Sequence, residues 1–145
     1  MTTTLISPAR SDDLKAVLAL LATHRLPQDG LAEHLETALV ARVGGQVVGC
    51  AAIEPYDGAG LLRSVAVAEP QRGTGLGMRL TEAAIRLAEA RGIRALYLLT
   101  ETAAGFFSRF GFRPIPRDEV APAVRQSIEF TRACPASAAA MVKEL

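Results

Sequence analysis

Apolar residues in the first part of the chain recur at helical spacing. Leu14, Val17, Leu18 and Leu21 fall on one side of a helix, and Ser11–Asp13 before them offers an N-cap. Residues 31–38 follow a turn-rich stretch and predict a second, shorter helix. Residues 3–6 predict a short strand before both. The chain is therefore expected to begin with one strand and two helices.

The period changes to that of β-structure after residue 38. Residues 39–43 and 46–54 are two β-rich runs, and Gly44-Gly45 between them is typical of a tight hairpin turn. A second turn is predicted over residues 55–60, and residues 61–67 form the third strand of this group.

The second half alternates between helical and strand patterns. A long helix is predicted from 77 to 91, because its apolar residues share one face and Gly92 suits a left-handed C-terminal cap. The apolar run 95–100 predicts a strand covered on both faces. The remaining expectations are helices at 103–110 and 118–130 and strands at 112–115 and 138–142.

This order of elements predicts an α/β (α+β) fold, with helices on both sides of a mixed sheet. Residues 61–100 form a strand–helix–strand unit. The length of 145 residues suits one domain, and no internal repeat or linker divides it, so residues 1–145 are expected to form a single domain.

Composition and charge exclude several classes of protein. Half of the residues are hydrophobic and 21% are charged, which is too apolar for a disordered chain. The formal charge of +1 provides no basic field for nucleic acid or an anionic membrane. No leader pattern or long apolar run is present, which predicts a cytoplasmic protein. Cys50 and Cys134 lack the spacing of a zinc site, so no metal is expected and buried thiols are favoured.

The candidate chemistry lies between the third strand and the long helix. Glycines at positions 73, 75 and 77 follow Arg72 and allow close approach of the backbone to a ligand. Their N–H groups can converge on one anion at the start of a helix, which predicts a phosphate or pyrophosphate site. The spacing differs from that of dinucleotide and nucleoside-triphosphate loops. By itself, such a loop could also be a tight turn.

Arg72, Gly75 and Gly77 match the cofactor-binding pattern of the GNAT family of N-acetyltransferases, which the chain resembles from about residue 40 to residue 113. Residues 103–112 resemble the family's second motif, a short helix ending in Gly-Phe. A finer resemblance links the segments LLRSVAV and LYLLTETAAGFFSRFGF to small acetyltransferases of bacterial arsenic-resistance operons.

The resemblance implies a three-layer domain with a splayed sheet that binds acetyl-CoA where strand 61–67 diverges from strand 95–100. It implies direct transfer of the acetyl group to the amine of a small molecule, with a backbone N–H near Val65 or Ala66 polarising the thioester carbonyl. The residues that it implies for the cofactor are Val65, Ala66, Val67, Arg72, Gly73, Thr74, Gly75, Leu76, Gly77, Thr100 and Phe107. It also implies a possible homodimer paired through the last strand.

The reaction needs a group that accepts a proton. An amine with a pKa near 10.4 is neutral at pH 7 only about one time in 2,500, so a base or a water chain must assist. Glu54, at the end of a strand bordering the same cleft, is the first candidate, and Glu101 is the second. A solvated carboxylate is the alternative for each.

Phe107 stands where many family members have a tyrosine that protonates the departing thiolate, and a phenyl ring cannot donate a proton. Ser108, Tyr97 or water must then do so, or the thiolate leaves unassisted. The alternative function is therefore an acyl-CoA sensor or interaction module without catalysis.

Arg63 is predicted to share a face with Leu61, Val65 and Val67 by strand alternation. Its charge either pairs with a neighbour such as Glu54 or binds an anionic substrate. The second alternative points to an acidic amino acid, or a toxic analogue of one, as the acceptor. Tyr56 is a candidate for the wall of the same acceptor pocket.

Overall fold

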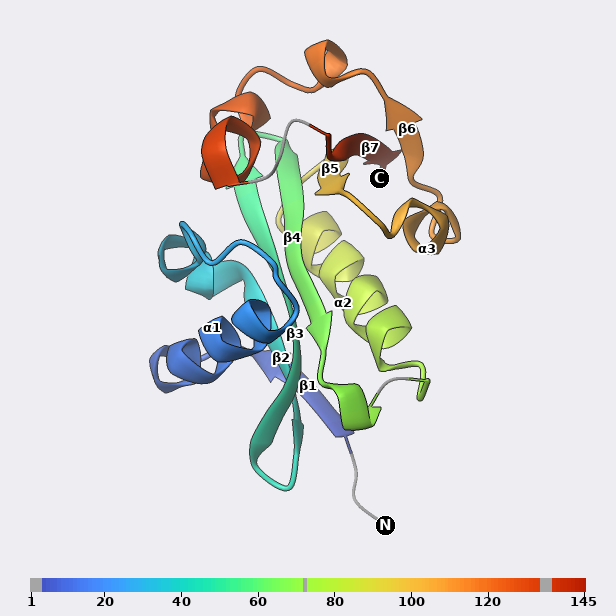
Figure 1. Cartoon of the computed structure of the whole chain (residues 1–145). Helices are drawn as coiled ribbons and strands as arrows, with labels where there is room; N and C mark the ends of the chain where they lie inside the picture. The colour runs from blue at the N-terminus through green and yellow to red at the C-terminus, as the bar shows by residue number, and fades with distance from the viewer. Residues whose placement is uncertain (1–3, 72, 134–136) are drawn as a thin grey trace.

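The computed structural model describes residues 4–71, 73–133 and 137–145. Seven strands form one mixed sheet in the order β1-β2-β3-β4-β5-β7-β6 (Figure 1). Their bounds are β1 Thr4–Pro8, β2 Ala38–Val43, β3 Gln46–Tyr56, β4 Ala59–Val67, β5 Ala95–Thr100, β6 Arg113–Ile115 and β7 Ala139–Glu144. The α-helices are α1 Leu14–Thr23, α2 Leu76–Ala90 and α3 Ala104–Ser108, and the short helices include η1 Ser11–Asp13 and η2 Leu31–Thr37. The predicted fold class is confirmed.

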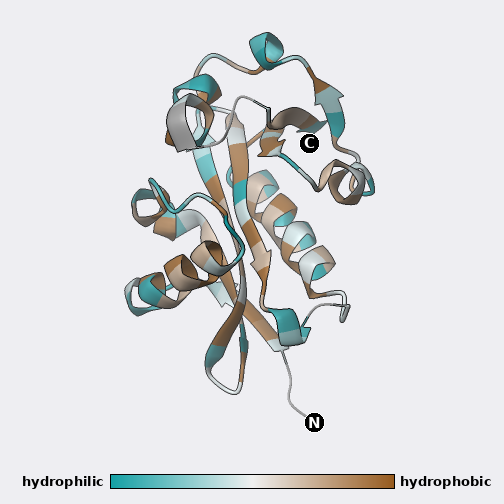
Figure 2. Cartoon of the chain, in the orientation of Figure 1, coloured by the Kyte–Doolittle hydropathy of each residue, from teal (hydrophilic) through white to brown (hydrophobic). Residues whose placement is uncertain are grey.

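Helices cover the two faces of the sheet and bury apolar side chains on each of them. Leu80, Ala84 and Ala88 of α2 pack on one face with Ile53 and Leu62. On the other face, Val17 and Leu21 of α1 pack with residues of β2, β3 and β4. Figure 2 shows apolar residues concentrated on the central strands between these helices. No helix in the described part of the chain is long and apolar enough to cross a membrane.

Both hairpins turn on two residues with positive φ. Gly44 and Gly45 join β2 to β3 at φ 58° and 83°, as the sequence predicts. The predicted turn over residues 55–60 is too long, because β3 continues to Tyr56 and β4 begins at Ala59. Asp57 and Gly58, at φ 42° and 85°, make the whole connection. Asp-Gly suits this geometry, since both positions need φ above zero.

The sheet opens between β4 and β5. These two parallel strands pair only from Ala59 to Leu61 and from Ala95 to Tyr97. Beyond Leu61, the edge of β4 that faces β5 has no strand partner. This is the splayed sheet that the family resemblance implies.

A β-bulge lies where β4 leaves β5. Cys50 pairs with Ala66 and Ala52 pairs with Arg63, so two residues of β4, Ser64 and Val65, oppose one residue of β3. Ser64 has φ 61°, which a residue other than glycine rarely adopts.

The bulge reverses the side-chain alternation. Arg63 therefore lies on the α1 face with Ala52, while Val65 and Val67 pack on the α2 face. The prediction that Arg63 shares a face with Val65 and Val67 is wrong for this reason.

The C-terminal third departs furthest from the predictions. The predicted helix over residues 118–130 is replaced by short helices at Arg117–Glu119, Val124–Gln126 and Glu129–Ala133. Pro122 explains the break, because it has no N–H and its ring obstructs the preceding turn. The predicted last strand exists, but β7 pairs with β5 on one side and β6 on the other. It is not a free edge for a second chain.

Candidate active site

A groove of about 1070 Å³ follows the opening between β4 and β5. The start of α2 and the glycine turn before it form one end, and the loop after α1 forms part of the other. Glu129 and Ala138 complete the wall near that loop. The groove-lining residues that the sequence predicts for the cofactor are Val65, Ala66, Val67, Gly73, Gly75, Leu76, Gly77, Thr100 and Phe107.

The glycine turn leaves open space beside its backbone. Gly73 and Gly75 have φ 81° and 82°, and a Cβ atom added to either would meet nothing within 4 Å. Gly75 is the residue that precedes α2, so the free N–H groups of the first helical turn begin beside it. Thr74 is not among the groove-lining residues, and its hydroxyl donates to the carbonyl oxygen of Gln71 at 2.6 Å. Arg72 lies outside the described residues.

Thr100 and Phe107 form the wall opposite β4. The hydroxyl of Thr100 accepts a hydrogen bond from the backbone N–H of Ala103 at 2.9 Å, just before α3 begins. Phe107 is 8% exposed and packs edge-on against Phe106 and Phe112. Tyr97 and Ser108, the alternatives for protonating the thiolate, are not among the residues that line the groove.

Arg63 is the centre of a buried polar network beside the groove. Its Nη1 donates to Oε2 of Glu54 at 2.8 Å, and its Nε lies 3.2 Å from Oε2 of Glu129. Nη2 donates to the carbonyl oxygen of Pro27 at 3.2 Å, and Nε donates to the Ser64 hydroxyl at 3.0 Å. The Arg63 side chain is 0% exposed. Pairing of Arg63 with Glu54 is therefore the arrangement that the structure shows.

Glu54 and Tyr56 come together, but beside a different cavity. They line a space of about 440 Å³ with His34, Ser127 and others, and neither is among the residues that line the larger groove. Tyr56 donates its hydroxyl hydrogen to Oε1 of Glu54. Nε2 of His34 lies 3.8 Å from the same oxygen.

The surroundings of Glu54 keep it ionised. Burial opposes its charge, but hydrogen bonds from Ser127, Tyr56 and Arg63 outweigh burial and hold the pKa of Glu54 below its ordinary value. Burial and the bond to Glu54 raise the pKa of Tyr56 to about 12. A carboxylate with a lowered pKa is a weak base, so this environment favours a structural charge over a proton acceptor.

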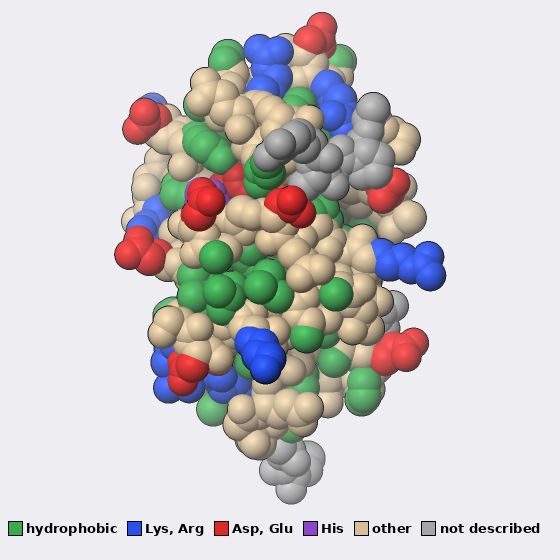
Figure 3. Space-filling view, turned by 60° about the vertical axis from the view of Figure 1, so that its left-hand side comes forward, with side chains coloured by type: hydrophobic (Ala, Val, Ile, Leu, Met, Phe, Trp, Pro, Cys, Tyr) green, Lys and Arg blue, Asp and Glu red, His purple; other side chains and the backbone are tan. Residues whose placement is uncertain are grey.

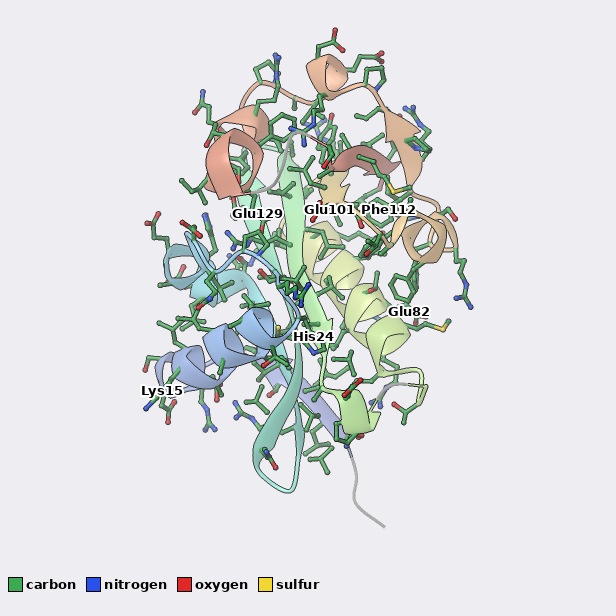
Figure 4. All side chains as sticks on the ribbon, viewed as in Figure 1. Lys15, His24, Glu82, Glu101, Phe112 and Glu129 are labelled. Atoms are coloured by element: carbon green, nitrogen blue, oxygen red, sulfur yellow. The ribbon has the colours of Figure 1, made fainter. Side chains whose placement is uncertain are left out.

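Two carboxylates do line the groove: Glu101 and Glu129 (Figure 4). Glu101 is exposed just after β5, and Glu129 is 4% exposed beside Arg63. The sequence identified Glu101 but not Glu129, which it assigned to a long helix. The signal that could have found it is Arg63, a charged residue within a predicted strand. A buried charge needs partners, and Glu129 is one of the two carboxylates that pair with it.

Cys50 is a buried thiol, as the sequence predicts. Its Sγ donates to the carbonyl oxygen of Ser64 at 3.1 Å, and burial raises its pKa to about 12. It is therefore unreactive at neutral pH. Cys134 lies outside the described residues.

Metal ligands and charge add no further site. The described ranges contain no group of three or more His, Cys, Asp or Glu side chains placed to hold a metal ion. The face in Figure 3 carries acidic and basic side chains in small separate groups, in keeping with the formal charge of +1.

Comparisons with known proteins agree with this architecture. The family model of the GNAT acetyltransferase domain matches residues 34–114, which is more than half of the chain. An N-acetyltransferase of Chlorobaculum tepidum, described as uncharacterized, is 35% identical over 91 residues. That match covers 62% of this chain, and the chain spans only 58% of the relative's length.

Solved structures share the fold over nearly the whole chain. A Mycobacterium tuberculosis protein in complex with CoA is 24% identical, with a TM-score of 0.83 over 97% of this chain and 99% of that one. The N-acetylglutamate synthase of Neisseria gonorrhoeae, in complex with coenzyme A and N-acetyl-glutamate, is 23% identical. Its TM-score is 0.84 over 100% of this chain and 36% of that one. With the splayed sheet, the glycine turn and the family match together, this chain belongs to the GNAT acetyltransferase family.

Proposed function

We propose that this protein is an acetyl-CoA-dependent N-acetyltransferase that transfers the acetyl group directly to the amine of a small molecule. The observation that carries the proposal is the groove along the unpaired edge of β4, with the glycine turn at one end and the loop after α1 at the other. A donor bound along β4 and an acceptor entering past the loop would meet beside the bulge at Ser64.

The residues present fit acetyl-CoA. The open space beside Gly73 and Gly75 suits a pyrophosphate held by backbone N–H groups at the start of α2. The edge of β4 from Val65 to Val67 offers backbone groups to the pantetheine arm, because β5 has already diverged. When bound, acetyl-CoA supplies the activated acetyl group. A backbone N–H at the bulge, near Val65 or Ala66, would polarise the carbonyl.

Glu101 is the better-placed carboxylate for the proton of the amine. It is exposed and lines the groove, whereas Glu54 is behind Arg63 and engaged by three partners. We expect Glu101→Gln to lower kcat and to reduce its rise with pH. Glu54→Gln tests the first candidate, and a changed pH profile in that variant alone would restore Glu54 as the base.

The charge of the acceptor amine decides which small molecules should be tested. Arg63 no longer argues for an acidic acceptor, since Glu54 and Glu129 already neutralise it. An acidic amino acid would instead have to meet Arg25 or Arg109, which are both exposed in the groove wall. The similarity to the gonococcal synthase in complex with N-acetyl-glutamate is the reason to test acidic amino acids as acceptors. We also keep the arsenic-resistance branch as a proposal, tested with toxic phosphorus or arsenic analogues of amino acids.

The test is release of free thiol from acetyl-CoA in the presence of acidic amino acids, their toxic analogues, polyamines or aminoglycosides. A thermal-shift titration with acetyl-CoA runs in parallel. Turnover with one class supports the enzyme and identifies its acceptor. Absence of any thermal shift would remove the cofactor assignment and the proposal with it.

A non-catalytic acyl-CoA sensor is the second candidate, and Phe107 favours it. The ring lines the groove at the position of the usual tyrosine and provides no proton. The sensor predicts a thermal shift with acetyl-CoA and no turnover with any amine. The cytoplasmic location and a homodimer remain predictions, and light scattering tests the second.

A further inference from the structure

We propose that Arg63 is a positioning residue that fixes the bulge of β4 and the acceptor end of the groove. This inference rests on the proposed function, and it replaces the interpretation of Arg63 as an anchor for an anionic substrate. Four contacts to four parts of the chain carry it.

The first contact concerns the bulge itself. Ser64 is held at φ 61° where β4 leaves β5, and such a conformation persists only when its surroundings enforce it. Two side chains form hydrogen bonds to Ser64. Nε of Arg63 donates to its hydroxyl, and Sγ of Cys50 donates to its carbonyl oxygen.

The other contacts join separate segments around the groove. Nη2 of Arg63 reaches the carbonyl oxygen of Pro27, in the loop that contributes His24 to Pro27 to the groove wall. Nε reaches Glu129, which lines the same wall from the C-terminal third. Nη1 reaches Glu54 on β3. One guanidinium therefore connects the bulge to both segments that face an entering acceptor.

The chemistry of the side chain makes this role specific to arginine. A guanidinium presents donors in a planar fork, so it can serve carboxylates and a carbonyl oxygen in different directions at once. A lysine ammonium is a single point with three donors. The cleft of the cofactor begins with the glycine turn at the far end of β4, so loosening this network should disturb alignment of the acceptor more than binding of acetyl-CoA.

Arg63→Lys tests the proposal, with Arg42→Lys as a matched control. Arg42 pairs with both carboxylate oxygens of Asp13, and neither residue lines the groove, so the control makes the same chemical change at a partly buried ion pair elsewhere. We expect Arg63→Lys to lower kcat at least tenfold. The KM for acetyl-CoA, and the acetyl-CoA concentration at the midpoint of the thermal-shift titration, should stay within twofold of the wild-type values. The reduction should be the same for acidic and neutral acceptors. Arg42→Lys should leave kcat within twofold.

A second variant covers the possibility that Arg63→Lys fails to fold. Ser64→Ala removes only the hydroxyl and leaves the ion pairs of Arg63 in place, and it should lower kcat several-fold at an unchanged KM for acetyl-CoA. Amide hydrogen exchange provides a readout without turnover. Exchange near Val65 should accelerate in both variants, and exchange in the loop 24–30 should accelerate in Arg63→Lys, which also weakens the contact to Pro27.

Three results would overturn the inference. The first is wild-type kcat and exchange in both variants. The second is an equal loss of kcat in Arg63→Lys and Arg42→Lys. The third is a raised KM for acidic acceptors alone, which would identify Arg63 as a substrate anchor. If the wild type binds acetyl-CoA but never turns over, the proposed function fails, and the exchange measurement decides the positioning role by itself.

Discussion

At the scale of single residues, Gly75 and Gly45 share a conformation but differ in place. Their φ angles are 82° and 83°, and a Cβ at either would meet nothing within 4 Å. Gly75 lies in the groove at the start of α2, while Gly45 is in the turn between β2 and β3. Substitutions at these two glycines therefore distinguish the effect of backbone strain, which both would show, from the loss of an anion site, which only Gly75 would show.

We expect Gly75→Glu to abolish binding of acetyl-CoA, because it adds a side chain and a negative charge where the pyrophosphate would lie. Gly45→Glu should add the same left-handed strain, about 1–2 kcal/mol of folding free energy, and leave the affinity for acetyl-CoA unchanged. Isothermal titration with CoA measures the affinity of both variants. Unchanged affinity in Gly75→Glu would contradict the pyrophosphate assignment.

Phe107→Tyr tests whether the missing proton donor limits turnover. The ring already lines the groove, so Phe107→Tyr would add a proton donor to the wall of the proposed acetyl-CoA site. We expect kcat to rise by about two- to tenfold. This is less than the full effect of a positioned general acid, because a thiolate of ordinary pKa already leaves without much assistance. Phe110→Tyr is the control, since Phe110 is not among the groove-lining residues. A sensor would show turnover in neither variant.

At the scale of elements, the turn chemistry explains which predictions succeeded. The glycine hairpin, α2 and β5 follow from local pattern, because their boundaries are set by residues within each element. The region 118–130 does not. Its apolar residues have helical spacing, but Pro122 breaks the backbone ladder, and Val120 and Val124 instead pack against Leu61 of β4.

Asp13 fixes the entry to α1 against β2. It accepts hydrogen bonds from the backbone N–H of Arg10 and from both terminal nitrogens of Arg42, and the Arg42 bond lowers the pKa of Asp13. We expect Asp13→Asn to reduce the free energy of unfolding by about 2 kcal/mol at pH 7. Asp12→Asn, an exposed neighbour, should change it little.

The sign of the pH dependence follows from that lowered pKa. The stabilisation is present above the ordinary aspartate value of 3.8 and is lost as the pH falls through the lower folded value. The gap between the wild type and Asp13→Asn should therefore shrink below pH 4. Urea unfolding from pH 7 to pH 3 measures it, and a gap that is constant over this range would exclude the ion pair as its source.

At the scale of the whole molecule, β7 closes the sheet and completes a core. It pairs with β5 over six residue pairs and places Met141, 1% exposed, in the core under α2. We expect the amides of β5 and β7 to exchange hydrogen only on global unfolding, whereas β6, a short edge strand, opens locally. Exchange of Met141 and Val142 as fast as that of β6 would contradict this topology.

The position of β7 also changes the expectation for a dimer. Its two sides are occupied, so a second chain cannot add to it, and β1 and β6 are the edges of the sheet. Light scattering that shows a dimer would therefore direct attention to these edges or to a helical face.

The sequence by itself determined the family and the fold class, and it predicted most of the residues on the β4 side of the groove. These depend on local features: glycines that adopt positive φ, a helix that starts beside them, and strands of apolar residues. The tertiary structure alone decided the acceptor side. A single bulge at Ser64 reversed the alternation of β4, turned Arg63 to the α1 face and buried its charge between Glu54 and Glu129. Burial of a charge requires partners, and segments distant in sequence provide them.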